Sequence, residues 1–394
     1  MKKYKPWLVV AVLILLLKGL ELVLDYAFGN HDGELVALRY LQFFVLGFFV
    51  FFLSSKIKSK FFSNLVLALS SVFLLLGFLE FVFYFLVNFT LPANAYSYKE
   101  KSDSDQLPFT RYDKDFGYRA AASHAFEKTM FFNGKEAMRC QYSVDSLSRR
   151  VTPAFYKNPA DKKYAFFFGC SFTYGFMLND DQSIPAALAK ADTNFHSYNY
   201  ALNGYGTQQL LSTLKMKNIR REIPEKEGVF IYPFIDHHVR RVIGDQYVMA
   251  NFDWAKERPY YVLENDTLLL KGDFSARPLT NFIYRLLHKS YMLEYFGISF
   301  PLSAEEEGIA LTAKIIDEAY KEYKSKFGND NFYVLIFPGQ KIAIGAYLKE
   351  KNIKVLDYSK LYDIENPLYH IPGDHHPSSK ACEIIAKKLA HDID

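Results

Sequence analysis

The chain has 394 residues, of which half are hydrophobic and 17% are aromatic, and its formal net charge is only +4 at pH 7. So small a positive charge gives no case for nucleic-acid binding. Three cysteines without paired spacing indicate neither a disulfide framework nor a zinc site. No nucleotide-binding motif is present, so the sequence implies no cofactor.

Three strongly apolar stretches occupy the first ninety residues, at 7–24, about 37–54 and about 63–89. Each approaches or exceeds the ~18–20 residues that cross a bilayer as a helix. We therefore expect residues 1–90 to form a membrane anchor with three transmembrane helices. The near-zero mean hydropathy of the whole chain then reflects a polar domain that follows this anchor.

The charges between these stretches predict their orientation. Lysines precede the first stretch and fill the loop between the second and third, whereas acidic residues follow the first. Positive loops stay inside, so we expect a cytoplasmic amino terminus and an extracytoplasmic domain after about residue 90, in a bacterial inner membrane. A cleaved signal peptide ending at Ala93-Asn94-Ala95 is the alternative, but the span before it is too long for that reading.

Three charged residues lie within the apolar stretches, namely Lys18, Glu21 and Glu80. Charges inside a membrane usually face partner helices, because lipid exposure costs ~2.5–3.5 kcal/mol on insertion scales. The sequence allows a Lys18–Glu80 pair. It equally allows Glu21 and Glu80 to reach the outer interface.

The remaining chain divides into a β-rich lead-in at 91–160 and an α/β domain at 161–394. In the second part, short apolar runs alternate with amphipathic segments, which predicts a mostly parallel sheet covered on both faces, a three-layer α/β fold. The expected strands are 164–168, 195–201, 229–234, 332–337 and 354–357, and the expected helices are 183–191, 207–222 and 378–391. The lead-in would pack beside this domain as a spacer or rim.

An insertion at about 245–330 interrupts the alternation. It begins with a predicted hairpin, strands 260–263 and 267–270, and continues with expected helices near 280–297 and 303–326. Ligands of open α/β sheets bind beyond the carboxyl ends of the strands, so this insertion could form a lid or a pocket wall. It could equally be scaffolding.

Two short segments carry the residue types of nucleophilic catalysis. Ser171 follows the apolar run Tyr164–Phe168 in a small-residue turn, and Asp374 and His376 lie about two hundred residues later. A serine, a histidine base and an acid that orients the base are what acyl transfer through a covalent intermediate requires. Cys170 abuts the serine, and we interpret it as a buried structural thiol.

The segment Gly169-Cys-Ser-Phe-Thr-Tyr-Gly175 resembles the first block of the SGNH (GDSL-like) hydrolases, in which Ser171 would be the nucleophile. Asn199–Gln208 is similar to the block that contributes an oxyanion-hole glycine, here Gly204. Asp374-His-His-Pro377 resembles the block that carries the acid and base. The resemblance spans roughly residues 164–391 and implies an SGNH-type fold with a working triad.

The chemistry that this resemblance implies begins with attack of Ser171 on an ester carbonyl after His376 removes its proton, while Asp374 orients the imidazole. The backbone N–H groups of Ser171 and Gly204 would hold the oxyanion, a contribution of ~2.7–4 kcal/mol per well-placed donor. Water would then give hydrolysis, and a sugar hydroxyl would give transfer.

Two departures from the family pattern concern the acid and the oxyanion hole. A single residue separates Asp374 from His376, a spacing similar to that of the alginate O-acetylation enzymes. Since His376 directly precedes Pro377 as in the family block, His375 is expected to be a pocket-edge or solvent-facing residue rather than the base. Ile235 occupies the place where relatives supply an asparagine side chain, so Asn203 or His237 would have to replace that donor. Asp236, His237 and His375 are candidate pocket residues, although the local pattern first predicts Asp236 to be a helix N-cap with Arg240 as its partner four residues on.

Adjacent histidines, at 237–238 and 375–376, are poorly spaced for one ion, so no metal is expected. The leading functional hypothesis is an anchored serine esterase or O-acyltransferase that acts on acylated envelope or exported glycans. A transferase would need a separate membrane protein as acyl donor. The alternatives are a glycan-binding or assembly component without turnover, and a lipase or thioesterase if the 280–297 helix lines an apolar tunnel beside Ser171.

Overall fold

The computed structural model describes residues 44–45, 47–52, 54–90, 96–103, 108–155, 162–302 and 304–393. They fall into two compact units. The N-terminal unit comprises Met1–Ala93 and Leu287–Ile298, and the α/β unit comprises Asn94–Leu286 and Ser299–Asp394.

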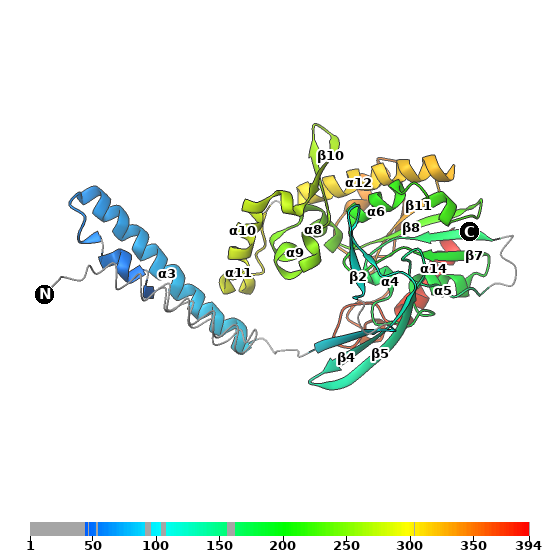
Figure 1. Ribbon diagram of the computed structural model, residues 1–394, viewed down its shortest axis with the longest axis horizontal. Coiled ribbons are helices and arrows are strands. Elements are labelled where there is room, and N and C mark those ends of the chain that lie inside the picture. The colour runs from blue at the N-terminus through cyan, green and yellow to red at the C-terminus, as the bar shows by residue number, and fades with distance from the viewer. Residues whose placement is uncertain are drawn as a thin grey trace. The chain divides into compact units, whose positions relative to one another are not determined.

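A five-stranded parallel sheet forms the centre of the α/β unit, which confirms the predicted α/β class (Figure 1). Its order is β12-β11-β8-β6-β7, and every neighbouring pair is parallel. The strands are β6 (Lys163–Phe167), β7 (Phe195–Asn199), β8 (Gly228–Phe234), β11 (Phe332–Ile336) and β12 (Lys354–Asp357).

Helices cover both faces of this sheet. On one face α5 (Ile184–Ala191) packs against α14 (Ser379–Ile393), and on the other α12 (Ala304–Phe327) packs against α6 (Thr207–Lys215) and α8 (His237–Ile243) (Figure 1). Strands buried on both faces need apolar side chains at consecutive positions. The fully buried run Phe166, Phe167 and Phe168 in and after β6 meets that need.

The order of the strands creates a switch point beside β6. From β6 the chain passes to β7 on one side and then to β8 on the other. Connections that leave in opposite directions open a crevice at the carboxyl ends of the two strands, where ligands bind in such sheets. Ser171 follows β6, and Ile235 follows β8, at this crevice.

Two helices expected to be continuous are broken. The segment 207–222 forms α6 and the short α7 (Ile219–Glu222), because the chain leaves the helical conformation at Met216, with ψ of 132°. The segment 280–297 forms α10 (Pro278–Leu287) and α11 (Tyr291–Tyr295). The Ser290 side chain accepts from the amide of Leu293 and so starts a new helix.

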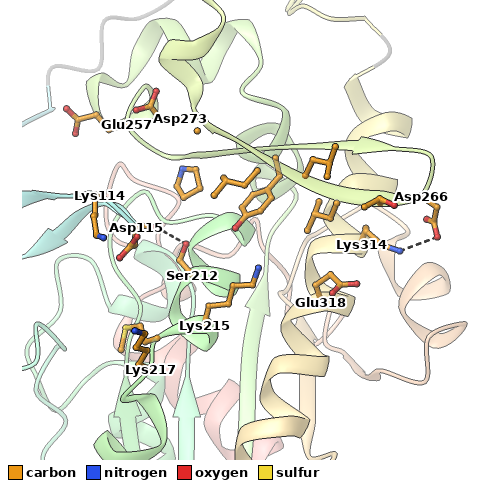
Figure 2. Close-up of a pocket in the computed structure, with 18 residues that line it drawn as sticks. Lys114, Asp115, Ser212, Lys215, Lys217, Glu257, Asp266, Asp273, Lys314 and Glu318 are labelled. Carbon is orange, nitrogen blue, oxygen red and sulfur yellow. Dashed lines mark hydrogen bonds and ion pairs between the residues drawn. The ribbon is translucent and has the colours of Figure 1, made fainter.

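The insertion contains the predicted hairpin, formed by β9 (Pro259–Glu264) and β10 (Thr267–Asp273). Asn265 and Asp266 both have positive φ, 49° and 58°, as a two-residue type I′ turn requires. Beneath the hairpin lies a cavity of about 960 Å³, bordered by α6 and α12 and by side chains of both charges (Figure 2). It shares no lining residue with the cavity at Ser171.

The lead-in forms two antiparallel sheets. One has the order β1-β4-β5, from β1 (Tyr96–Ser102), β4 (His124–Phe132) and β5 (Lys135–Val144), and the other pairs β2 (Thr110–Asp113) with β3 (Gly117–Ala120). Backbone bridges from Arg150 to Val144 and to Asn199 join β5 to the edge strand β7. The lead-in therefore belongs to the same compact unit as the parallel sheet.

The Arg150 side chain reinforces this junction from inside. It is 2% exposed, and its guanidinium donates to the carbonyl oxygens of Tyr174, Gly175 and Leu178 at 2.7, 2.6 and 2.5 Å. A buried guanidinium is tolerated only when its donors are satisfied. Arg150 thus ties the lead-in to the loop that follows the Ser171 turn.

The N-terminal unit is built on α3 (Lys60–Thr90). Lys60–Val87 has a mean hydropathy of 2.4 and is, by length and composition, able to cross a membrane. Helical residues 47–52 pack against it, with Ser70 Oγ donating to the Gly47 carbonyl at 2.8 Å. The predicted span at 7–24 and part of the one at 37–54 lie outside the described residues.

Glu80 in α3 has a partner that the sequence did not suggest. Its carboxylate accepts hydrogen bonds from the amide of Tyr291, at 2.8 Å, and from the Ser290 hydroxyl, so it caps the amino end of α11. Tyr84 and Phe83 also contact α11 through their rings. Lys18, the other candidate partner, lies outside the described residues.

We predict that replacing Arg150 with methionine destabilises the protein by about 3 kcal/mol or more, because three carbonyl oxygens lose a charged, buried donor. Thermal unfolding of the detergent-solubilised chain would measure this. Arg139→Met is the matched control, since Arg139 forms exposed ion pairs with Glu127 and Glu136 worth at most ~1 kcal/mol. Equal decreases in Tm for the two variants would contradict the structural role of Arg150.

Candidate functional site

Ser171 stands at the start of α4 (Ser171–Tyr174), directly beyond β6. The turn is tight: a Cβ added at Gly169 would lie 2.2 Å from the Thr173 hydroxyl, so only glycine fits. Ser171 is 7% exposed and borders a cavity. Cys170 beside it is fully buried and free, as expected of a structural thiol.

The structure brings Asp374 and His376 to this serine from the loop between β12 and α14. His376 Nε2 lies 2.7 Å from Ser171 Oγ, and His376 Nδ1 lies 2.5 Å from Asp374 Oδ1. The same carboxylate oxygen accepts from the His376 backbone amide at 3.0 Å. Serine, imidazole and carboxylate are therefore connected in the order that nucleophilic catalysis requires.

The Asp374 carboxylate is held in its charged form. Burial alone would raise its pKa, but hydrogen bonds and charge from His376, with a further hydrogen bond from Tyr98, lower the pKa of Asp374 to about 2. Tyr98 Oη donates to Asp374 Oδ2 at 2.9 Å. Burial and the nearby carboxylate raise the pKa of Tyr98, so its hydroxyl keeps the proton that it donates.

Aromatic rings fix the plane of the His376 imidazole. The rings of Phe176 and Phe172 lie with centroids 4.4 and 5.1 Å from it. Lys128 Nζ lies 4.7 Å from the Phe176 ring centroid and 3.1 Å from a carboxylate oxygen of Glu100. A packed imidazole has few alternative orientations, which keeps Nε2 directed at Ser171.

Gly204 adopts a conformation that other residues rarely take, with φ of +80°. A Cβ there would lie 2.5 Å from the Tyr118 hydroxyl and 2.9 Å from the Trp254 ring. Tyr118 Oη also donates to the Asn203 carbonyl at 2.7 Å. Within the described chain, the backbone amides of Ser171 and Gly204 have no acceptor, which leaves both available as oxyanion donors.

Asn203 and His237, the two residues proposed to replace the missing oxyanion donor, both border the cavity. Asn203 does so with its side-chain oxygen buried and without a partner among the described residues. His237 lines the cavity as well, and burial together with Arg241 and Arg240 lowers its pKa. Ile235 reaches the same cavity with a side chain that cannot donate.

The roles predicted for Asp236, as a pocket residue and as a capping residue paired with Arg240, are wrong. Asp236 stands at the N-cap position of α8 but makes no side-chain capping bond and does not line the cavity of Ser171. Its carboxylate instead accepts from the amides of Lys341, at 2.9 Å, and Ile342, at 3.2 Å. Arg240 pairs with Asp245 at 2.5 Å rather than with Asp236.

His375 is exposed at the rim of the cavity, next in sequence to His376. His238 is fully buried and makes a 2.8 Å hydrogen bond through Nδ1 with the Tyr232 hydroxyl. Among the described residues, no group of three or more histidine, cysteine or acidic side chains is arranged to hold a metal ion.

The cavity at Ser171 has a volume of about 650 Å³. Its walls come from the parallel sheet, the lead-in and the insertion, the last through Phe252 and Trp254. Six aromatic residues line it together with ten polar or charged ones, so it offers a ligand both ring faces and hydrogen-bonding groups. None of residues 280–286, the part of that segment in the same compact unit, lines it, so these residues form no apolar tunnel beside Ser171.

Sequence comparisons leave the family open: no family model and no curated protein matches the chain. A solved structure of a protein from Desulfitobacterium hafniense DCB-2, assigned to the lipolytic G-D-S-L family, aligns with 59% of this chain and all of its own, at 16% identity and a TM-score of 0.34. That alignment is too loose to carry an argument, and the site rests on its own geometry.

Several residues of the site were not identified from sequence. Tyr98, Tyr118 and Lys128 all come from the lead-in. The sequence pattern of the lead-in predicted a spacer or rim and did not indicate that its side chains contribute to the site. The exposed, lysine-rich β1 segment gives no sign of a tyrosine directed at an acid 276 positions away.

We predict that Tyr98→Phe lowers the stability of the α/β unit by about 1 kcal/mol at neutral pH, because Asp374 loses a donor. The pKa of Asp374 is lowered on folding, so this stabilisation is present above pH ~4 and is lost as pH falls towards ~2. Unfolding followed between pH 2 and 7 would measure it. Tyr112→Phe, at a ring 67% exposed, is the control, and a difference independent of pH would refute the assigned hydrogen bond.

We further predict that Gly204→Ala abolishes most reactivity of Ser171, since the added methyl group would collide with Tyr118 and Trp254 and displace an oxyanion donor, a loss of roughly 10²–10³ in rate. Gly134→Ala provides the matched control, because Gly134 has a similar φ of +76° with open space around it. Labelling of Ser171 by a fluorophosphonate would report the rate. If both variants react like the wild type, Gly204 does not serve the oxyanion.

Proposed function

We propose that the protein is a serine esterase or O-acyltransferase that works through an acyl-enzyme at Ser171. The observation that carries this proposal is the connected series Ser171 Oγ, His376 Nε2, His376 Nδ1 and Asp374 Oδ1, with contacts of 2.7 and 2.5 Å. The series ends at Ser171, which borders a cavity where a substrate could bind. A hydrogen-bond network with a purely structural role would have no need of such a position.

In the proposed reaction, His376 accepts the Ser171 proton as Oγ attacks the ester carbonyl, and Asp374 stabilises the resulting imidazolium. The amides of Ser171 and Gly204 hold the oxyanion. His376 then returns the proton to the departing alcohol, which leaves an acyl-enzyme. Water or a second alcohol, deprotonated by His376, then attacks the acyl carbonyl; the bond from the acyl carbon to Ser171 Oγ breaks, and His376 returns the proton to Ser171.

The proposed substrate is an acylated glycan of the cell envelope or an exported polysaccharide. Support comes from the aromatic cavity, whose Trp254 and Phe252 rings could stack on sugar faces, and from the proposed membrane anchor with three spans and an extracytoplasmic catalytic domain. The hydrophobic helix Lys60–Val87 supports one of those spans. If the acyl group is transferred to a glycan, a separate membrane protein would supply it.

A second candidate is a glycan-binding component without turnover. The observation that favours it is Ile235, which lines the cavity with a side chain that cannot donate to an oxyanion. In this case the cavity would bind an acylated sugar while Ser171 remains unacylated. A lipase or thioesterase has less support, because it would be favoured by an apolar tunnel from that segment, and residues 280–286 do not line the cavity.

The experiment that tests the proposal is hydrolysis of 4-nitrophenyl acetate by the full chain in detergent, with mass spectrometry of the Ser171 peptide. We expect an acetyl adduct on Ser171, its absence in Ser171→Ala, and a rate lower by about 10³-fold or more in His376→Ala. An acetylated oligosaccharide formed when a glycan acceptor is added would identify the transferase.

Cys170→Ser is the matched control, since the thiol is adjacent in sequence but buried. It should retain the adduct on Ser171. A folded wild type that forms no adduct, and that is no more active than Ser171→Ala, would reject the esterase and leave the binding component.

A further inference from the structure

One face of α10 (Pro278–Leu287) is apolar, and its side chains are exposed. Leu279, Phe282, Ile283 and Leu286 are 71%, 52%, 43% and 54% exposed. Their spacing of i, i+3, i+4 and i+7 places them on a single stripe of the helix. The opposite side packs inwards through Tyr284, which is 8% exposed.

Single exposed apolar residues are ordinary, but four in one stripe mark a contact surface. Cationic side chains accompany this stripe. Arg285, His288 and Lys289 are exposed beside it or just beyond its end. An apolar face with basic residues at its margin is the pattern of a helix that lies in the headgroup region of a membrane.

The chain continues from α10 into α11, which contacts the apolar helix α3. Three residues after α10, Ser290 begins α11, whose first amides and hydroxyl bond to Glu80 of α3. These contacts lie within the N-terminal unit. The carboxyl end of α10 is therefore held within a few residues of a point on α3.

The position of Glu80 along α3 indicates how deep in a membrane its contact with α11 would lie. Glu80 follows Lys60 by about 20 residues, which is roughly 30 Å of helix at ~1.5 Å per residue. The hydrocarbon core of a bilayer is about 30 Å thick. With Lys60 at one boundary, Glu80 and the start of α11 stand at the opposite boundary, where a helix such as α10 could rest on the surface.

We propose that α10 is an interfacial helix, whose stripe Leu279, Phe282, Ile283 and Leu286 is buried in the outer surface of the membrane. This inference rests on the proposed membrane span of α3, but not on the chemistry at Ser171. It gives the insertion a function, namely a second membrane attachment of the chain besides α3.

The test uses single introduced cysteines in the full chain, because the three native cysteines are buried. Phe282→Cys, Leu279→Cys and Leu286→Cys each carry an environment-sensitive fluorophore, in nanodiscs of phosphatidylcholine and phosphatidylglycerol with or without a nitroxide on the acyl chain. We expect emission at shorter wavelength, and quenching by nitroxide lipid of at least about twofold, at all three positions.

Two further positions separate the possible failures. Lys271→Cys, on exposed β10, should stay unquenched, whereas Leu76→Cys, 44% exposed on α3, should be quenched. Quenching at position 76 but not at the three α10 positions overturns the interfacial helix alone. No quenching at position 76 overturns the membrane span and the inference with it.

Another protein surface is the competing occupant of the stripe. If fluorescence at position 282 shifts to shorter wavelength as protein density increases, with no quenching by nitroxide lipid, the stripe contacts a second copy and the proposal is wrong. Each variant should keep the wild-type Tm, since the replaced side chains are exposed.

Discussion

The constraint on which the site depends is that five parallel strands end at one edge of the sheet. Ser171 and His376 are 205 positions apart, and only the return of the chain to this edge brings them within 2.7 Å. The loop that carries His376 is also closed on itself. Ile371 N donates to the His376 carbonyl at 2.9 Å, and Asp374 N donates to the Ile371 carbonyl at 2.9 Å.

The second requirement is the lead-in, which supplies what the parallel sheet lacks. In the parallel-sheet domain, only one oxygen of the Asp374 carboxylate, Oδ1, is bound to the imidazole of His376. Tyr98 from β1 holds the second oxygen, and Tyr118 from β3 packs over Gly204. A buried Arg150 then fixes the lead-in to the backbone after α4. Nucleophile, acid and oxyanion donors are thus oriented by the parallel sheet and both sheets of the lead-in together.

The sequence predicts well those features that depend on neighbours in the chain. Continuous apolar runs predict β6, β8 and β11, because a strand covered on both faces has no polar positions. The pairing of Ser171 with Asp374 and His376 comes from residue type and resemblance. Helix ends are less predictable: Ser290 competes for backbone amides and divides 280–297, which hydrophobic pattern alone cannot reveal.

Contacts made across the fold were beyond prediction for a different reason. Tyr98, Tyr118 and Arg150 act at positions that are fixed only when the lead-in packs against the parallel sheet. Asp236 illustrates the converse, since local pattern favours an N-cap, while the amides of residues 341 and 342 after β11 offer the carboxylate two donors. A tertiary contact of that kind replaces a local one whenever it satisfies more of the charge.

Glu80 shows how hydrogen bonds from the start of another helix can accommodate a charge in an apolar helix. A carboxylate there must find donors, because an unsatisfied charge in an apolar environment is costly. The amino end of α11 supplies a hydroxyl and backbone amides, groups that a helix start leaves unpaired in any case. The carboxylate of Glu80 thus gains hydrogen-bond donors, and the first amides of α11 gain an acceptor. The insertion therefore returns to the N-terminal unit at the one position of α3 where an acidic side chain can hold it.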